Sequence, residues 1–276
     1  MSVILGIDIG GSTTKVAGFH ASGERISMLQ VEASDRLTSL YGAIGNFLST
    51  NRVPLSEVSR FVLTGVGAAL VDGAIYGVTT EHVDEFNAIG AGGLHLSGKK
   101  EALVVSLGTG TAFIRAGKDG FRHIGGSGVG GGTLAGLAWH LLHENDYASL
   151  ADIAEKGDLK NVDLSIADIC SDDISQLPAH TTASNFGRIR NSASNADIAM
   201  GLINMVFQTV GMLSVFALRN DPVRDAVLIG TLAKLTLAPK VLASVEELYD
   251  VRFFIPEDAV YATAIGAALP YLDRAE

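Results

Sequence analysis

The chain has 276 residues, of which 47% are hydrophobic and 18% are charged. This length suits one large domain or two modest domains that share a cleft, and the composition favours a buried core over a disordered chain. The formal net charge of -10 disfavours nucleic acid and anionic membranes as partners. An anionic ligand would therefore have to be held locally, by backbone N–H groups and a few well-placed cations.

Because Cys170 is the only cysteine, a disulfide within the chain and a multi-cysteine zinc or iron–sulfur site within one chain are excluded. This cysteine usage fits a reducing cytoplasm. The first residues carry no basic leader and reach Asp8 too soon for a signal peptide, so we expect none. The segment 198–218 is long enough to span a bilayer, but glycine and polar residues interrupt it. We expect it to be a core or dimer-interface helix.

The N-terminal segment has the pattern of a β-hairpin with a glycine tip. An apolar run over 3–8 ends in Asp8, a glycine turn follows at 10–12, and residues 14–19 return as a strand. Apolar spacing then predicts a helix over 37–50. A buried strand that ends at a glycine is expected over 61–65, before the small-residue segment 88–93.

The opening pattern recurs about a hundred residues later. Residues 102–107 form an apolar strand, 108–110 a glycine turn and 111–115 a returning strand, with Ser106 where the first unit has Asp8. The recurrence suggests a duplicated fold, although glycine hairpins are common enough for chance similarity to be an alternative.

The rest of the chain alternates between further strands and helices. The expected elements are a helix start at 133–139, a polar and partly helical segment at 147–176, the long helix 198–218, strands at 226–231 and 251–255, and a C-terminal helix at 259–271. This alternation is typical of an α/β fold, and the absence of a low-complexity linker predicts lobes in close contact.

The segment from Asp8 to Lys15 has the composition of a phosphate-binding turn. Glycines let a backbone approach phosphate oxygens and point N–H groups at them, and Ser12, Thr13 and Thr14 add hydroxyl donors. Lys15 can sit near a γ-phosphate, and Asp8 can hold Mg²⁺ directly or through water. A plain hairpin with a surface lysine is the alternative.

Two further glycine turns could complete such a site. Gly108–Thr111 can form a second phosphate cradle, a weak signal that gains force beside the first hairpin. The cluster 125–132 leads directly into a helix, whose N-terminus would attract an anion. It matches G-x-G-x-x-G, but no buried strand precedes it and no acidic strand end follows about twenty residues later, so a dinucleotide-binding fold is disfavoured. The P-loop pattern is absent.

A hydroxyl kinase also needs a carboxylate that accepts the proton of the acceptor alcohol, and Asp84 and Glu85 are candidates. Adjacent residues of an extended segment point in opposite directions, so only one of them can face a cleft. Spacing alone favours a solvent-facing acidic turn. Arg122 and His123 precede the glycine cluster and could contact a carboxylate or phosphate, or be hairpin-end charges.

Together these segments resemble the type II pantothenate kinases, of the actin-like, ribonuclease-H-like ATPase superfamily. The matching segments run in family order over nearly the whole chain, and the stretch 146–187 is especially specific because other superfamily members lack it. They are 6–15, 85–88, 108–111, 125–132, Tyr147 with its flanks, 182–187, 229–231 and 264–267.

The resemblance implies an α/β, duplicated ribonuclease-H-like fold, with a first lobe over 1–95 and a second over 96–276 that carries the dimerisation helix. It implies phosphorylation of pantothenate by MgATP in a cytoplasmic homodimer, with Glu85 as catalytic base and Asp8 as the Mg²⁺ ligand. The residues that it places on the ATP side are Asp8, Gly10, Gly11, Ser12, Thr13, Thr14, Lys15, Thr109, Gly110, Gly130, Gly131, Gly132, Thr133, Leu134, Ala135, Tyr147 and Thr231.

One position departs from the family pattern. The family usually has an arginine at the position of His123, where it helps to hold the substrate, and here Arg122 comes one residue earlier. Either Arg122 takes over this role through a local shift or the substrate contact differs. A histidine would give a weaker and pH-sensitive grip on a carboxylate.

Three other functions within the superfamily remain as alternatives. A sugar kinase of the N-acetylglucosamine type commonly has an aspartate base and, in one large group, a zinc cysteine cluster, and neither pattern is evident. An ATPase activator of an acyl-CoA dehydratase needs cysteines for a cluster between two chains, and Cys170 alone leaves the set one pair short. A catalytically weak nucleotide sensor is disfavoured by the presence of Asp8, Lys15 and Glu85.

Overall fold

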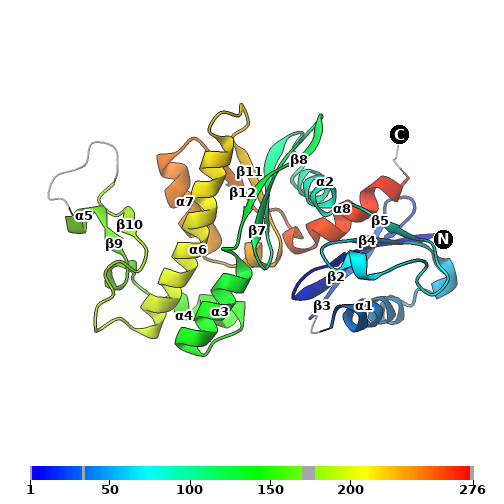
Figure 1. Ribbon diagram of the computed structural model, residues 1–276, viewed down its shortest axis with the longest axis horizontal. Helices are drawn as coiled ribbons and strands as arrows, with labels where there is room; N and C mark the ends of the chain where they lie inside the picture. The colour runs from blue at the N-terminus through cyan, green and yellow to red at the C-terminus, as the bar shows by residue number, and fades with distance from the viewer. Residues whose placement is uncertain (1, 33–34, 170–177, 274–276) are drawn as a thin grey trace.

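Two five-stranded sheets form the framework of the protein in the computed structural model, which describes residues 2–32, 35–169 and 178–273 (Figure 1). Cys170 lies outside these residues, as does the part of the predicted polar segment from 170 to 176. The first sheet has the order β3-β2-β1-β4-β5. Its strands are β1 (Val3–Ile9), β2 (Thr13–His20), β3 (Arg25–Glu32), β4 (Val58–Thr64) and β5 (Thr80–His82).

The second sheet repeats the topology of the first, with the order β12-β11-β6-β7-β8. Its strands are β6 (Ala102–Leu107), β7 (Thr111–Gly117), β8 (Gly120–Ser127), β11 (Asp225–Ile229) and β12 (Arg252–Phe254). In each sheet the first strand pairs antiparallel with the second and parallel with the fourth, β1 with β2 and β4, and β6 with β7 and β11. The predicted duplication of an α/β unit is therefore confirmed.

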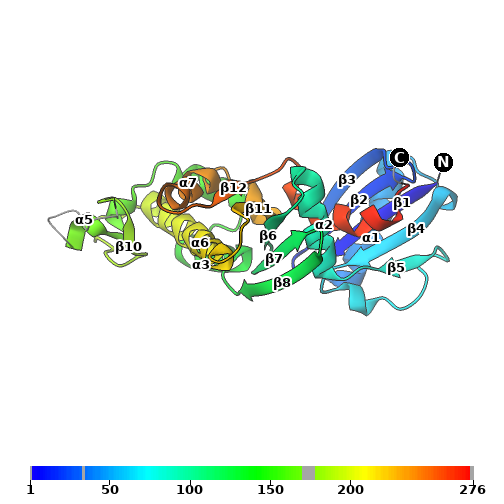
Figure 2. The ribbon, with the colours of Figure 1, turned by 90° about the horizontal axis from the view of Figure 1, so that it is seen from above.

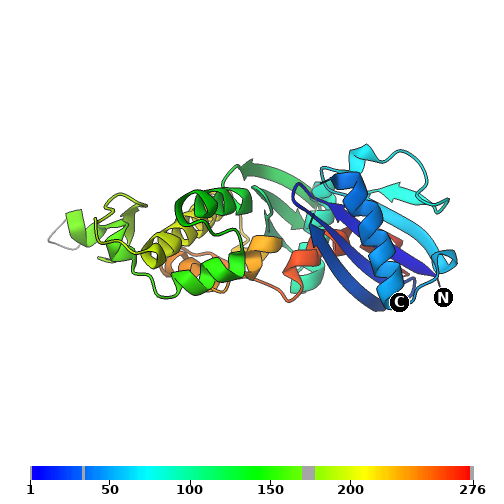
Figure 3. The ribbon, with the colours of Figure 1, turned by 90° about the horizontal axis from the view of Figure 1, so that it is seen from below.

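The outer face of each sheet is covered by helices of its own lobe. In the first lobe, α1 (Arg36–Asn51) lies across the sheet (Figure 3). The glycine at position 18 makes room for Phe47 of that helix. In the second lobe the outer helices are α3 (Gly131–Leu142), α4 (Tyr147–Ala154), α6 (Asn195–Leu218) and α7 (Ala238–Leu248). The structure also contains α5 (Ile166–Ile169) and the ribbon of β9 (Leu164–Ser165) and β10 (Thr182–Ser184), which lie at the far end of the molecule from the first sheet (Figure 2).

Two central helices lie between the sheets, and each packs on the sheet of the opposite half of the chain. The helix α2 (Glu85–Ser97) contributes Ile89 to a core with strands of the second sheet. The helix α8 (Ala262–Ala268) contributes Ala264 and Ile265 to a core with strands of the first sheet. The lobe limits at residues 95 and 96 stay a prediction. Because α2 and α8 each pack on the sheet of the opposite half of the chain, no single cut in the sequence separates the two cores.

Glycines allow the two central helices to come into backbone contact. A Cβ atom on Gly92 would lie 1.8 Å from the carbonyl oxygen of Ala262, and one on Gly266 would lie 1.9 Å from that of Ala88. No side chain fits at either position, so the helices cross at van der Waals distance of their backbones. This crossing joins the lobes beside the cleft.

The helix α6 is long and apolar enough to cross a membrane, as the sequence suggested. In its most apolar window, 56% of the residues are buried inside the protein, and its side chains form much of the second lobe's core. Burial of this kind is what a core helix of a globular protein shows. The helix α6 is therefore a core helix of the second lobe, one of the two roles that the sequence predicted for it.

Candidate active site

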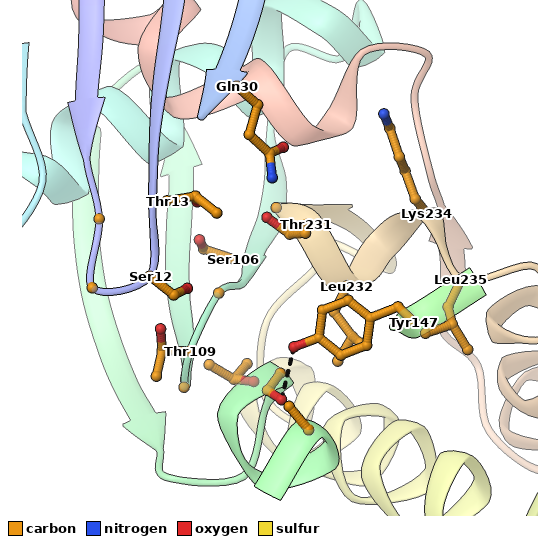
Figure 4. Close-up of a pocket in the computed structure, with 18 of the residues that line it drawn as sticks. Ser12, Thr13, Gln30, Ser106, Thr109, Tyr147, Thr231, Leu232, Lys234 and Leu235 are labelled. Carbon is orange, nitrogen blue, oxygen red and sulfur yellow. Dashed lines mark hydrogen bonds between the residues drawn. The ribbon is translucent and has the colours of Figure 1, made fainter. Parts of the chain in front are cut away.

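A cleft of about 1440 Å³ opens between the two sheets and collects side chains from both lobes (Figure 4). The sequence-predicted residues that line it are Asp8, Gly10, Gly11, Ser12, Thr13, Lys15, Glu85, Thr109, Gly110, Gly131, Ala135, Tyr147 and Thr231. Both glycine hairpins therefore face one space, as the sequence predicted from their recurrence.

The floor of the first lobe is a row of polar side chains across three strands. Asp8 of β1 is directly opposite Lys15 of β2, and Lys15 is opposite Gln30 of β3. Because laterally paired residues share a face of a sheet, the three side chains lie side by side at the cleft. The Lys15 Nζ is 3.5 Å from the Asp8 Oδ2, and both residues are buried.

Burial controls the proton affinity of Asp8. Removal of its carboxylate from water raises the pKa of Asp8 above the ordinary value, and the charge and hydrogen bond of Lys15 lower it in part. A buried carboxylate whose pKa is raised in this way gains from a positively charged ligand. Asp8 is therefore suited to meet a cation that enters with a substrate.

The acidic pair at the start of α2 has two different roles. The Asp84 carboxylate accepts a hydrogen bond of 3.0 Å from the backbone N–H of Asn87, so it caps the helix. Glu85 is the first residue of α2 and lines the cleft. The cap thus commits one acid of the pair to structure and leaves the other free to face a substrate.

The pKa of Glu85 is raised above its ordinary value by burial first, and then by the negative charges of Asp8 and Asp84, with Lys15 acting in the opposite direction. The side chain is half-buried and responds to the charge of Asp8, which shows that the two carboxylates are electrostatic neighbours. A carboxylate with a raised pKa accepts a proton more readily, as a general base requires.

The second lobe offers backbone and hydroxyl groups at the equivalent places. The turn after β6 carries Thr109, and Gly230 and Thr231 follow β11, all along the cleft. Tyr147, the first residue of α4, donates a 2.9 Å hydrogen bond from its hydroxyl to the carbonyl of Gly131 (Figure 4). Its ring is therefore held against the start of α3, with one face toward the space between the lobes.

The glycine cluster before α3 allows the hairpin turn and the helix to meet closely. A Cβ on Gly130 would lie 2.7 Å from the backbone of Gly110, and one on Gly132 would lie 2.9 Å from the side chain of Thr109. The N–H groups of Gly131 and Gly132 donate to the carbonyls of Gly108 and Thr109, at 2.9 and 2.8 Å. These two N–H groups are used inside the protein, so an anion at this helix start would rely on other donors and the helix dipole.

Seven sequence-predicted site residues do not line the cleft. They are Thr14, Arg122, His123, Gly130, Gly132, Thr133 and Leu134. Thr14 alternates with Lys15 along β2 and is fully buried, and Leu134 belongs to the core of the second lobe. Thr133 accepts a hydrogen bond from the N–H of Gly130 and donates one to the carbonyl of Gly128, so it braces the turn.

Arg122 and His123 lie on β8 and point to opposite faces of this strand. The His123 ring stacks on Phe86, with ring centroids 4.2 Å apart and planes inclined by 8°. Arg122 instead lies on the side of Asp221, whose pKa is lowered chiefly by the hydrogen bond from Arg115 and to a smaller extent by the charge of Arg122. The structure therefore brings His123, and not Arg122, to the side of β8 that faces Phe86, the residue after Glu85.

Several cleft residues were missed by the sequence analysis. They are Gln30, Glu32, Ser106, Asp146, Asp152, Lys234 and Thr263, among others. Gln30 becomes visible only through its register with Lys15, because β3 was not predicted as a strand. Asp152 follows Ala148 at helical spacing on one face of α4, a signal that the sequence did carry.

Comparison with known proteins places this architecture in a class. The protein resembles the activator of the 2-hydroxyisocaproyl-CoA dehydratase from Clostridium difficile, solved with bound ADPNP, with a TM-score of 0.73, 18% identity and coverage of 98% of this chain and 94% of that chain. It also resembles a ROK hexokinase from Thermus thermophilus, with a TM-score of 0.56, 15% identity and 97% coverage of each chain. The protein thus has the actin-like ATPase fold, in which two related lobes enclose a cleft.

The family follows from the sequence comparisons. The model of the Fumble family matches residues 98–245, and a type II pantothenate kinase from Oceanobacillus iheyensis is 30% identical over 274 residues, which cover 96% of this chain and 98% of that protein. This chain belongs to the Fumble family, together with the type II pantothenate kinases.

Proposed function

We propose that this protein transfers the γ-phosphoryl group of ATP to the primary hydroxyl of pantothenate and so catalyses the first step of coenzyme A synthesis. The observation that carries the proposal is Glu85, a cleft carboxylate with a raised pKa beside the pair of Asp8 and Lys15. Family membership and coverage of nearly the whole length of a type II pantothenate kinase support the same reaction.

In this reaction Glu85 accepts the proton of the acceptor hydroxyl while the hydroxyl oxygen bonds to the γ-phosphorus. The bond between that phosphorus and the bridging oxygen of ADP breaks, and ADP leaves with the bonding electrons. The protein contributes position and charge rather than covalent chemistry. Lys15 brings a cation to the row that Asp8 begins, and the two hairpin turns bring backbone groups from opposite sides.

Charge balance favours a divalent cation with the nucleotide. Carboxylates line the cleft at Asp8, Glu32, Glu85, Asp146 and Asp152, and ammonium groups at Lys15 and Lys234. A triphosphate that entered without a counterion would meet an excess of negative charge. Bound Mg²⁺ would neutralise the oxygens of the phosphate chain.

The residues at Asp8 fit this ion. Among the described residues there is no group of three His, Cys, Asp or Glu side chains that could hold a metal. Mg²⁺ is commonly held by one or two carboxylates together with water and substrate phosphates, so Asp8 could serve as its protein ligand. Thr64 lies beside Asp8 in the register of β1 and β4, and its buried hydroxyl has no hydrogen-bond partner among the described residues. Asp8 would hold the hydrated ion, with this hydroxyl available to one of its waters.

Assembly and location complete the proposal. We infer a cytoplasmic homodimer whose interface includes α6, as the resemblance to the type II pantothenate kinases implies. Phe216 of this helix is 59% exposed, and aromatic residues are enriched at protein interfaces. Light scattering of the purified protein gives its mass in solution, and a monomer at micromolar concentration would contradict the dimer.

A coupled assay of ADP release tests the reaction. We expect turnover with pantothenate and pantetheine and none with glucose or N-acetylglucosamine; turnover with a sugar alone would overturn the proposal in favour of a sugar kinase. Glu85→Gln should lower kcat by roughly 10²–10⁴-fold, because the amide cannot accept the proton. Binding of ATP, measured by calorimetry, should change little. Near-normal turnover of this variant would remove Glu85 from the role of base.

A further inference from the structure

Val66 is an apolar side chain in an otherwise polar half of the cleft. The other described residues of the first lobe that line the cleft are glycines, hydroxyl or amide residues and charged residues: Asp8, Gly10, Gly11, Ser12, Thr13, Lys15, Gln30, Glu32 and Glu85. The Val66 side chain is 62% exposed, whereas the valines of β1, β2 and β4 are buried. An exposed valine within a ligand cleft is available for contact with an apolar part of a ligand.

The backbone around Val66 fixes the direction of its side chain. Gly65 has a φ of +86°, and a Cβ there would lie 2.6 Å from the Asp8 Oδ1. A Cβ on Gly67 would lie 2.3 Å from the Ile9 Cγ2, and the Gly67 N–H donates a 2.9 Å hydrogen bond to the Ile9 carbonyl. Both neighbours are thus pressed against β1, so the loop is held in place and Val66 projects into the cleft.

This position is close to the reacting group. The strands β4 and β5 run parallel, and the N–H of Val83 donates a 2.9 Å hydrogen bond to the carbonyl of Leu63. Val66 comes three residues after Leu63, and Glu85 two residues after Val83. Both therefore follow the carboxyl ends of these parallel strands. Glu85 also responds to the charge of Asp8, against which Gly65 packs. Val66 and Glu85 therefore border one space on the acceptor side of the cleft.

The second lobe has a polar residue at the corresponding place. Gly230, with a φ of +95°, follows β11 as Gly65 follows β4, and the next residue is Thr231. The same turn thus carries a hydroxyl in the second lobe and two methyl groups in the first. This difference argues that the two loops contact different parts of the ligands.

We infer that Val66 is a specificity-determining residue that packs against the methyl-bearing carbon bonded to the hydroxymethyl group of the acceptor. The acceptor class is a primary alcohol whose CH2OH group is bonded to a carbon with methyl substituents. This inference rests on the proposed function, since pantothenate carries two methyl groups on that carbon. A sugar would instead present hydroxyl groups to the valine methyls, where they would lose hydrogen bonds to water without replacement.

A coupling experiment tests this contact. Initial rates are measured for wild type and Val66→Ala with pantothenate and with an analogue that lacks the two methyl groups beside the hydroxymethyl carbon. Wild type should prefer pantothenate, and Val66→Ala should lower kcat/KM for pantothenate by roughly 4- to 15-fold, as expected for one or two lost methyl contacts. The variant should lower kcat/KM for the analogue by less than twofold, because no methyl contact is there to lose.

The controls separate the contact from general damage. Leu70→Ala truncates another exposed apolar residue, a few positions later on the same connection and outside the cleft, and should leave every rate unchanged. The KM for ATP should be unaltered in both variants. Equal losses with both acceptors, or no loss with either, would overturn the role of Val66. Absence of turnover with pantothenate in wild type would instead overturn the proposed function on which this role depends.

Discussion

The two sheets share one topology but carry different chemistry at the cleft. In the first sheet the row through β1, β2 and β3 presents Asp8, Lys15 and Gln30. The equivalent row of the second sheet, through β6, β7 and β8, presents Ser106, Ala112 and Gly126. One scaffold thus offers charge on one side of the cleft and small side chains with accessible backbone on the other.

The turns after the parallel strands are alike in both lobes. Gly65 and Gly230 both have positive φ, and a Cβ on either would clash with the neighbouring first strand of its sheet. Backbone geometry is therefore the conserved part of the duplicated unit, and side-chain chemistry is the part that differs. Under the proposed function, the first lobe would act on the phosphates and the acceptor hydroxyl, and the second lobe would accommodate the rest of the nucleotide.

The largest expected effect comes from removing the polar group of corresponding residues in the two rows, which tests whether the two lobes have different roles. Asp8→Asn should lower kcat by roughly 10²–10³-fold, because it removes the charge that would hold a cation at the phosphates. Ser106→Ala should lower kcat/KM for ATP only about two- to tenfold, as for one neutral hydrogen bond. Steady-state kinetics at saturating Mg²⁺ measures both. Similar losses in the two variants would contradict the division between the lobes.

The helix crossing offers a test on stability. Gly92→Ala should lower the free energy of unfolding by about 1–3 kcal/mol or more, because its Cβ would lie 1.8 Å from the carbonyl oxygen of Ala262. Gly45→Ala on α1 is the matched control, since a Cβ there meets nothing within 4 Å, and it should stabilise the protein by about 0.4–1 kcal/mol. Urea denaturation measures both changes. An unaltered midpoint for Gly92→Ala would show that the central helices separate easily.

The smallest expected effect concerns the cost of ionising Glu85. Its pKa is raised in the folded protein, so the folded state binds the proton more tightly than the unfolded state does. Stability is therefore lost as the pH rises from the ordinary glutamate pKa through the raised value. Glu85→Gln avoids this loss and should raise the melting temperature slightly at pH 7. The corresponding gain in the free energy of unfolding should be about 1 kcal/mol or less. The gain should vanish near pH 4; a gain that persisted there would point to packing rather than ionisation.

Much of the fold could be predicted because its signals are local. The glycine turns at 10–12 and 108–110, the buried runs beside them and the helix over 37–50 follow from periodicity and turn chemistry, and the structure confirms them. The strand β3 was missed because it is half-buried along most of its length and lacks a strong apolar run. The exchange of α2 and α8 depends on contacts between residues far apart in the sequence, and the glycines that permit the crossing, Gly92 and Gly266, do not show which helices they join.

The candidate site was predictable from turn chemistry where its residues lie on a glycine hairpin, as Asp8 and Lys15 do. Glu85 lies at the start of α2 and was assigned by the family resemblance; all three residues line one cleft. The cluster before α3 shows the limit, because a glycine that permits backbone contact looks the same in sequence as one that admits a phosphate. Only the hydrogen bonds to Gly108 and Thr109 distinguish the two uses. Arg122 shows another limit, since the alternation of side chains along β8 decides which of two neighbouring residues lies on the side of Phe86.

The crossed packing of α2 and α8 makes the two halves of the protein depend on each other. A fragment that ended after α2, at Ser97, would lack the second sheet on which this helix packs, and the remaining fragment would carry α8 without the strands of the first sheet. Each fragment would leave an apolar helix face and an apolar sheet face in water. Mixed together, the fragments have complementary surfaces, so the protein is suited to reconstitution from two separately synthesised pieces.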